Sequence, residues 1–275
     1  MPAESGADLP LAGRVAVVTG VSRRIGIGFA IARRLLGDGA DVLIQGWPQH
    51  DREQRWGADE AAWEGLGAQL QDGLSDGAGR LEWLAADFAE ATAAATVIQA
   101  AVERLGRPDI LIANHARGSA EDLVSLTARE LDLSWAVNVR ATLLLVQAFA
   151  RLHSGAGSGR PHGRVVLLTS GQHLEPMPTE IPYALTKGAL QQITATLAKS
   201  LADRGVTVNC LNPGATDTGY ATQDERAELV RRHPEWRWGE PDDAARLIAW
   251  LCSDEGRWVT GQTLVSDGGM YLNRG

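Results

Sequence analysis

The 275-residue sequence is poor in cysteine, and its two cysteines are poorly placed to act together. Cys210 and Cys252 lie far apart in apolar surroundings, without the close spacing that is typical of a zinc site or a disulfide framework. We therefore predict two buried thiols in a reducing, cytoplasmic compartment and no metal site.

Long apolar runs and basic patches are also missing. No segment offers about 18 uninterrupted apolar residues, and the first residues have neither a basic nor an apolar signal region. We expect no membrane span, and a flexible N-terminal tail over residues 1–12. The formal net charge is -8, with both signs interspersed, so we expect no nucleic-acid partner.

Short β-branched runs alternate with longer amphipathic segments along the rest of the chain. This alternation predicts an α/β fold, a single-domain Rossmann-type doubly wound sheet over residues 13–275 with helices on both faces. The strands should be mostly parallel, about seven in number. The expected strands are 15–19, 41–45, 82–87, 109–114, 164–170, 206–212 and 263–267, and the expected helices are 29–39, one in the 90s and 100s, 128–150, 182–202 and 242–251.

Two polar stretches interrupt this alternation. Residues 46–61 are longer than a usual connection and could be surface decoration, could shape the adenine end of a nucleotide site or could contact another subunit. Residues 213–240 follow the end of a strand, where open α/β sheets bind ligands, so we expect a substrate loop there. Its aromatic residues either line an apolar substrate or pack the loop onto the core; they are Tyr220, Trp236 and Trp238.

A glycine-rich segment, TGVSRRIGIG, lies between the first strand and the first helix at residues 19–28. Backbone N–H groups and a helix N-terminus at such a turn favour a phosphate. The dinucleotide fingerprint G-x-G-x-x-G is incomplete, because Gly26 and Gly28 match its first half but Ile31 stands at the third position. This segment alone therefore fits a cofactor loop and a simple turn equally well.

Tyr183 and Lys187 are four residues apart in a helical pattern and share one face of the expected helix. An ammonium near a phenol lowers the phenol pKa from about 10, which suits proton transfer near neutral pH. The alternative is a surface pair. Ser170 ends a strand thirteen residues before Tyr183, and its hydroxyl could stabilise charge on the same substrate oxygen.

The whole set of features resembles one family. TG and GIG after the first strand, Asn114, Asn138, Ser170, YALTK, NPGATDT at 212–218 and SDGG at 266–269 stand in the order typical of the classical short-chain dehydrogenases/reductases. The sequence is most similar to 3-oxoacyl-acyl-carrier-protein reductase-like members. The resemblance implies the catalytic residues Ser170, Tyr183, Lys187 and Asn138, the last at a helix kink where it orders a water linked to the lysine.

The resemblance also implies a set of cofactor contacts. These are Gly20, Ser22, Arg23, Arg24, Gly26, Ile27, Asp87, Phe88, Asn114, Tyr183, Lys187, Pro213, Gly214, Thr216 and Thr218. Asp87 and Phe88 would contact the adenine. Five residues separate Gly20 from Gly26, more than the family's usual number, and we interpret the difference as a two-residue insertion.

Two departures from the family pattern affect the prediction. The usual N-N-A-G after the fourth strand is A-N-H-A at 113–116, which leaves His115 with a packing or a substrate-side role. The second strand ends without a carboxylate that would bind an adenosine 2′-hydroxyl, whereas Arg23 and Arg24 could bind a 2′-phosphate. We therefore expect NADP(H) to be preferred over NAD(H).

These features predict an NADPH-dependent carbonyl reductase that transfers a hydride to a ketone or 3-oxoacyl substrate, with tyrosine as acid/base. The alternatives are a secondary alcohol, steroid or sugar dehydrogenase and a non-catalytic NADP-binding sensor. The expected partner is a small-molecule carbonyl or alcohol. The family also implies a homotetramer or homodimer, formed through the long helices after the fourth and fifth strands.

Overall fold

A seven-stranded parallel sheet forms the centre of the protein, in the strand order β3-β2-β1-β4-β5-β6-β7. The computed structural model describes residues 9–53, 60–75, 77–153, 163–219, 221–232 and 237–272. The strands are β1 (Val15–Thr19), β2 (Asp41–Gly46), β3 (Leu81–Ala85), β4 (Ile110–Ala113), β5 (Gly163–Leu168), β6 (Val206–Asn212) and β7 (Thr263–Val265). The predicted Rossmann-type fold is confirmed.

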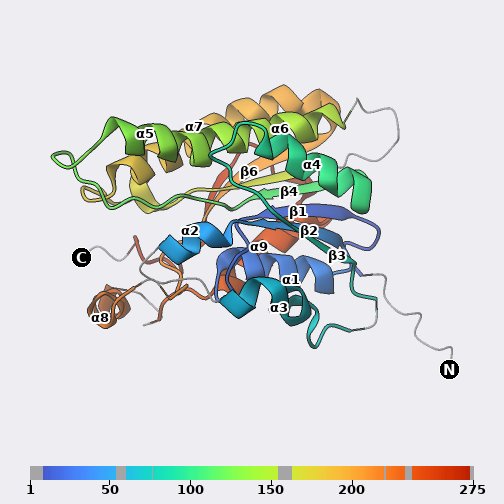
Figure 1. Cartoon of the computed structure of the whole chain (residues 1–275), viewed down its shortest axis with the longest axis horizontal. Coiled ribbons are helices and arrows are strands. Elements are labelled where there is room, and N and C mark those ends of the chain that lie inside the picture. Colours follow the sequence, from blue (N-terminus) through green and yellow to red (C-terminus); the bar gives the residue numbers. More distant parts are fainter. Residues whose placement is uncertain are drawn as a thin grey trace.

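Helices cover both faces of the sheet, as Figure 1 shows. One layer contains α1 (Ile27–Gly37), α3 (Glu60–Gln71) and α9 (Pro241–Cys252), and the other contains α4 (Ala93–Arg104), α6 (Ala141–Arg151) and α7 (Ile181–Leu201). Successive residues of β1 contribute to opposite cores, which explains why this strand is apolar throughout and does not alternate with polar residues.

The expected helix over 128–150 is interrupted. It consists of α5 (Ala128–Trp135), a π-helical turn η1 (Ala136–Arg140) and α6. By length and composition this stretch, Ala128–Arg151, could cross a membrane, but 56% of its most apolar window is buried inside the fold. A buried core helix meets the same criterion, so the stretch is weak evidence for a span.

Two elements were not expected from the sequence, since the polar stretch 46–61 contains α2 (Pro48–Glu53) and the start of α3. The substrate loop contains α8 (Gln223–Arg232), in agreement with the short helical pattern of its sequence. The predicted flexible tail is wrong at its end, because Leu11 is only 1% exposed and its N–H donates to the Asp38 carbonyl at 2.8 Å. Core packing therefore fixes the chain before residue 12, while residues 1–8 lie outside the described part of the chain.

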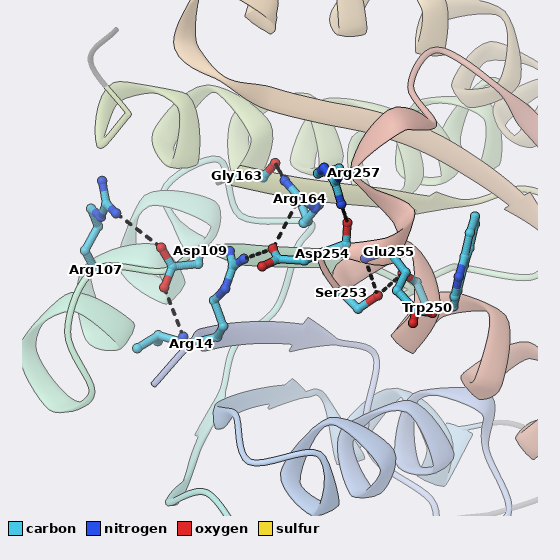
Figure 2. A network of polar contacts seen from close by, with 11 residues as sticks. Arg14, Arg107, Asp109, Gly163, Arg164, Trp250, Ser253, Asp254, Glu255 and Arg257 are labelled. Atoms are coloured by element: carbon cyan, nitrogen blue, oxygen red, sulfur yellow. Dashed lines mark hydrogen bonds and ion pairs between the residues drawn. The ribbon is translucent and has the colours of Figure 1, made fainter. Parts of the chain in front are cut away.

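A cluster of charged residues lies at the amino-terminal edge of the sheet, away from the strand ends that carry the glycine loop (Figure 2). Asp254 accepts a hydrogen bond from Arg14 at 2.9 Å and lies 3.9 Å from Arg164, whose side chain is only 2% exposed. Among the described residues, the Nε and Nη2 atoms of Arg164 have no hydrogen-bond partner. Burial lowers the pKa of this guanidinium, and Arg14 lowers it further.

Replacing Arg164 by methionine is therefore expected to leave stability unchanged or to raise it. Burial costs the Arg164 cation more hydration free energy than it gains from attraction to one carboxylate 3.9 Å away, and two of its nitrogens stay unsatisfied. An apolar side chain of similar length should therefore lower the unfolding free energy by no more than about 1 kcal/mol, or raise it. Thermal unfolding measures the change. Asp254→Asn is the comparison, because it leaves both arginines without their carboxylate and should lower the unfolding free energy by about 1 kcal/mol. A large loss of unfolding free energy in Arg164→Met that is not seen in Asp254→Asn would contradict the prediction.

Candidate cofactor and active site

The residues predicted from sequence converge on the carboxyl edge of the sheet. Gly20, Asn114, Ser170 and Pro213 follow β1, β4, β5 and β6, and β1 and β4 are neighbours in the sheet. The strand order reverses direction between β1 and β4, and α/β sheets bind ligands at such a switch point. The sheet topology therefore brings together segments that are far apart in sequence.

Two glycines of the glycine loop, Gly20 and Gly28, have no room for a side chain. Gly20 has a φ of +71°, and a Cβ there would lie 2.6 Å from the His115 Cα. A Cβ at Gly28 would lie 2.6 Å from the Gly20 carbonyl oxygen and 2.7 Å from Asn114 Nδ2. Gly26 caps α1 without a side-chain hydrogen bond, and the first turn of α1 has no acidic residue. The loop and its helix N-terminus therefore fit the phosphates of a dinucleotide.

The two arginines of this loop have different surroundings. Arg23 Nη2 donates to the Thr218 carbonyl at 3.0 Å, and its Nε lies 3.9 Å from Asp51 Oδ1. Arg24 is exposed. A Cβ at Gly219 would lie 2.5 Å from Ile25 Cδ1. The extra length between Gly20 and Gly26 thus brings the glycine loop against the segment that follows β6.

The residues expected on the adenosine side of the site lie at the ends of β2 and β3. The Gln45 side chain at the end of β2 accepts from Gly20 N–H at 3.1 Å and donates to the Ala86 carbonyl at 2.7 Å. Asp87 Oδ1 accepts from Ala89 N–H at 2.8 Å. The Phe88 ring is 3% exposed and packs 4.2 Å from the His115 ring, so its side chain lies in the core, and the adenine contact of this residue stays a prediction.

The Ser170 hydroxyl lies near the Tyr183 phenol at the end of β5. Burial raises the pKa of Tyr183 to about 12, and the nearby Ser170 hydroxyl acts in the opposite direction. The expected lowering of this pKa by lysine is therefore wrong, since loss of hydration is the largest cause of the shift and the negative charge of Glu180 raises the pKa as well. The phenol carries its proton throughout the neutral range.

Lys187 lies below the tyrosine ring and is 2% exposed. Its Nζ is 5.6 Å from the centre of the Tyr183 ring and donates to the Leu168 carbonyl at 2.8 Å. Burial lowers the pKa of Lys187 to about 8. The ammonium is therefore present at neutral pH and is lost as the pH rises past that value.

Asn138 is completely buried within the π-helical turn. Its Oδ1 accepts from Arg117 N–H at 2.6 Å, and its Nδ2 donates to the Arg117 carbonyl at 3.0 Å and to Thr186 Oγ1 at 2.9 Å. Thr186 is the neighbour of Lys187. Asn138 therefore connects the interrupted helix to the helix that carries the tyrosine and the lysine.

The segment after β6 is held by its own contacts. Thr216 is 4% exposed and its hydroxyl donates to the Pro213 carbonyl at 3.1 Å, while Gly214 N–H donates to Asn212 Oδ1 at 3.0 Å. Trp238 Nε1 donates to the Arg226 carbonyl at 3.1 Å, which fits the packing alternative for this residue. Tyr220 and Trp236 lie outside the described residues.

One residue of the site was missed from sequence. A Cβ at Gly171 would lie 2.6 Å from the Tyr271 hydroxyl, so the side chain of Tyr271 reaches the residue that follows Ser170. No pattern near the C-terminus indicated this approach, because Tyr271 is distant in sequence from every catalytic candidate.

A Rossmann-type sheet with a dinucleotide-fitting glycine loop and a Ser-Tyr-Lys arrangement defines a nicotinamide-dependent oxidoreductase acting on CH–OH or C=O groups. A family model described as "Enoyl-(Acyl carrier protein) reductase" matches residues 20–271. The chain belongs to the classical short-chain dehydrogenase/reductase family.

Individual relatives span nearly the whole chain. It is 40% identical to "Uncharacterized oxidoreductase YjdA" of Bacillus subtilis over 256 residues, covering 93% of this chain and 96% of that protein. It is similar to a blue fluorescent protein from a metagenomic library, solved in complex with NADPH, with a TM-score of 0.80, 32% identity and coverage of 95% and 99%. It is also similar to the promiscuous reductase LugOII, described as catalysing keto-reduction in lugdunomycin biosynthesis, with a TM-score of 0.80, 34% identity and coverage of 96% and 100%.

Proposed function

We propose that the protein is an NADPH-dependent carbonyl reductase that transfers a hydride to a ketone or 3-oxoacyl substrate. The phenol of Tyr183, which is protonated at neutral pH and lies near the Ser170 hydroxyl, carries this proposal. Reduction of a carbonyl needs a proton on oxygen, and a phenol with a pKa of about 12 holds its proton at neutral pH. A bound nicotinamide cofactor would supply the hydride.

Each catalytic residue of the site has a defined role in this proposal. Tyr183 donates the proton to the substrate oxygen, and the Ser170 hydroxyl holds that oxygen as negative charge develops. Lys187, charged below a pH of about 8, stabilises the phenolate that remains and binds ribose hydroxyls. Asn138 holds the helix of Tyr183 in register through Thr186.

Two solved structures similar to this chain support reduction with NADPH. The NADPH complex and the keto-reductase are both similar to this chain along almost its whole length. A secondary alcohol, steroid or sugar dehydrogenase would use the same site with another substrate. A non-catalytic sensor would have no need of a serine, a tyrosine, a lysine and an asparagine together at this place.

The test is oxidation of NADPH in the presence of a carbonyl panel that includes acetoacetyl thioesters, simple ketones and cyclic ketones. Turnover of ketones or thioesters is the expected result. Oxidation of secondary alcohols, steroids or sugars with no carbonyl reduction would favour the dehydrogenase alternative. Tight cofactor binding with no turnover in either direction would favour the sensor.

Arg24 is proposed to select the 2′-phosphate, since it is exposed at the loop while Arg23 bonds Thr218 and faces Asp51. Arg24→Ala should lower kcat/KM with NADPH about tenfold and leave NADH nearly unchanged, because one charge-assisted hydrogen bond is lost. Steady-state kinetics with both cofactors measure the ratio. Arg33→Ala, an exposed arginine farther along α1, is the control. An unchanged ratio in Arg24→Ala would contradict this assignment.

We also expect a cytoplasmic homotetramer or homodimer with no nucleic-acid or membrane partner. The family resemblance supports the assembly, and light scattering of the purified protein tests it.

A further inference from the structure

The π-helical turn η1 is held by a side chain that is unusual for the family pattern. In this turn the N–H of Ala141 donates to the Ala136 carbonyl, one residue beyond the α-helical acceptor, Val137. The Val137 carbonyl instead lies 3.0 Å from His115 Nε2. Because a carbonyl can only accept, the ring carries its proton on Nε2.

The other nitrogen of the same ring contacts the end of β1. His115 Nδ1 lies 2.7 Å from Thr19 Oγ1. Because Nε2 carries the ring proton, Nδ1 accepts a hydrogen bond from the threonine hydroxyl. Thr19 immediately precedes Gly20 of the glycine loop, and its Oγ1 also accepts from the N–H of Asn114 at 3.1 Å. The ring is 6% exposed and packs on Phe88. One buried imidazole therefore joins the cofactor loop to the π-helical turn.

The turn carries the connection further. Asn138, the residue after Val137, donates to Thr186 Oγ1 at 2.9 Å, and that hydroxyl donates to the Tyr183 carbonyl at 2.9 Å. A continuous set of hydrogen bonds thus runs from Thr19 through His115 and η1 to the helix that presents the tyrosine. Small misplacements of reacting groups are costly, because a shift of about 1 Å can reduce turnover about a hundredfold.

We propose that His115 is a positioning residue of this enzyme. It fixes the π-helical turn against the end of β1, and through Asn138 it sets the place of Tyr183 and Lys187 relative to the cofactor loop. The inference rests on the proposed function for its kinetic measurement. It concerns the Val137 bond specifically, so it predicts different results for side chains that can and cannot reach that carbonyl.

Three substitutions separate the two ends of the ring. His115→Asn keeps a polar atom near Thr19 but is too short to reach Val137, whereas His115→Gln carries an amide N–H near the position of Nε2. His115→Ala removes both contacts. We expect kcat to fall at least about tenfold in His115→Ala and His115→Asn, and to stay within about threefold of wild type in His115→Gln. The KM for the carbonyl should change less than kcat.

His153 offers a matched control. Its ring is also buried, at 4% exposure, its Nε2 donates to the Pro108 carbonyl at 3.1 Å, and it packs 4.4 Å from Phe149. None of these contacts involves the residues of the proposed site. His153→Ala should therefore lower Tm by an amount similar to His115→Ala while leaving kcat within about twofold.

Equal kcat in His115→Asn and His115→Gln would overturn the proposal in favour of a purely structural role. The same conclusion would follow if His153→Ala, at a similar loss of Tm, lost as much kcat as His115→Ala. If wild type reduces no carbonyl, the proposed function fails. The inference is then tested by fluorescence titration with NADPH, where His115→Asn should bind at least about threefold more weakly than His115→Gln and His153→Ala; equal affinities would overturn it. The amide variants keep the ring site filled, so the comparison survives if His115→Ala does not fold.

Discussion

Tyr183→Phe is expected to lower kcat for carbonyl reduction about a thousandfold while the affinity for NADPH stays within about threefold. The substitution removes the hydroxyl that carries the proton and leaves the aromatic ring in the same position. General acid catalysis contributes about a hundredfold to ten-thousandfold, and the Ser170 hydroxyl remains to bind the substrate oxygen without replacing the lost proton donor. Single-turnover kinetics with saturating NADPH measure the chemical step, and fluorescence titration measures cofactor binding.

Tyr271→Phe is the matched control. Both tyrosines have their hydroxyls near the end of β5, since the Tyr271 hydroxyl approaches Gly171 and the Tyr183 phenol lies near Ser170. Loss of the Tyr271 hydroxyl is expected to change kcat by less than about fivefold, because this group does not bond Ser170 in the proposed mechanism. Equal turnover by Tyr183→Phe and wild type would remove Tyr183 from its role as acid. A greater loss in Tyr271→Phe would move that role to the C-terminal tyrosine.

The sheet could be predicted because its strands are short, apolar and β-branched on both faces. β1, β4 and β5 are buried at every position, and no alternation with polar residues obscured them. The order of the strands brought the ends of β1, β4, β5 and β6 to one edge, so that residues chosen from separate segments became neighbours. The sequence pattern therefore predicted the strands correctly where burial alone determines the secondary structure.

The features that were missed depend on tertiary contacts. α3 contains Gly65 and Gly67, which weaken a helical pattern, and a Cβ at Gly67 would lie 3.1 Å from the Trp83 ring. The resemblance implied a helix kink at Asn138, and the structure has a π-helical turn there. The residues of WAVNVRA alone do not show this turn, because groups of the turn bond His115 and Arg117, which are distant in sequence. The direction of the Tyr183 pKa shift was wrong because the lysine was visible in the sequence and the loss of hydration was not.

Acid stability should depend strongly on His115. Burial lowers the pKa of this histidine to about 3, and the nearby charge of Lys187 lowers it further. In the unfolded chain the group titrates near 6.5, so between about pH 6.5 and pH 3 the unfolded state binds a proton that the folded state does not. The unfolding free energy therefore falls as the pH drops through this window, by up to about 5 kcal/mol, and His115 adds no pH dependence above it.

Urea unfolding of wild type and His115→Gln at pH 7 and pH 4.5 measures this contribution. Between these values wild type should lose about 3 kcal/mol more than the variant, since glutamine has no proton to gain. The carboxylates that also titrate here are common to both proteins and cancel in the difference, and Lys187 stays charged throughout because its pKa is about 8. Equal losses would mean that the imidazole gains its proton inside the folded protein as readily as in water. A substantial fraction of the rings would then be charged near neutral pH, and the neutral ring that donates to Val137 and accepts from Thr19 would not be the single state of the site.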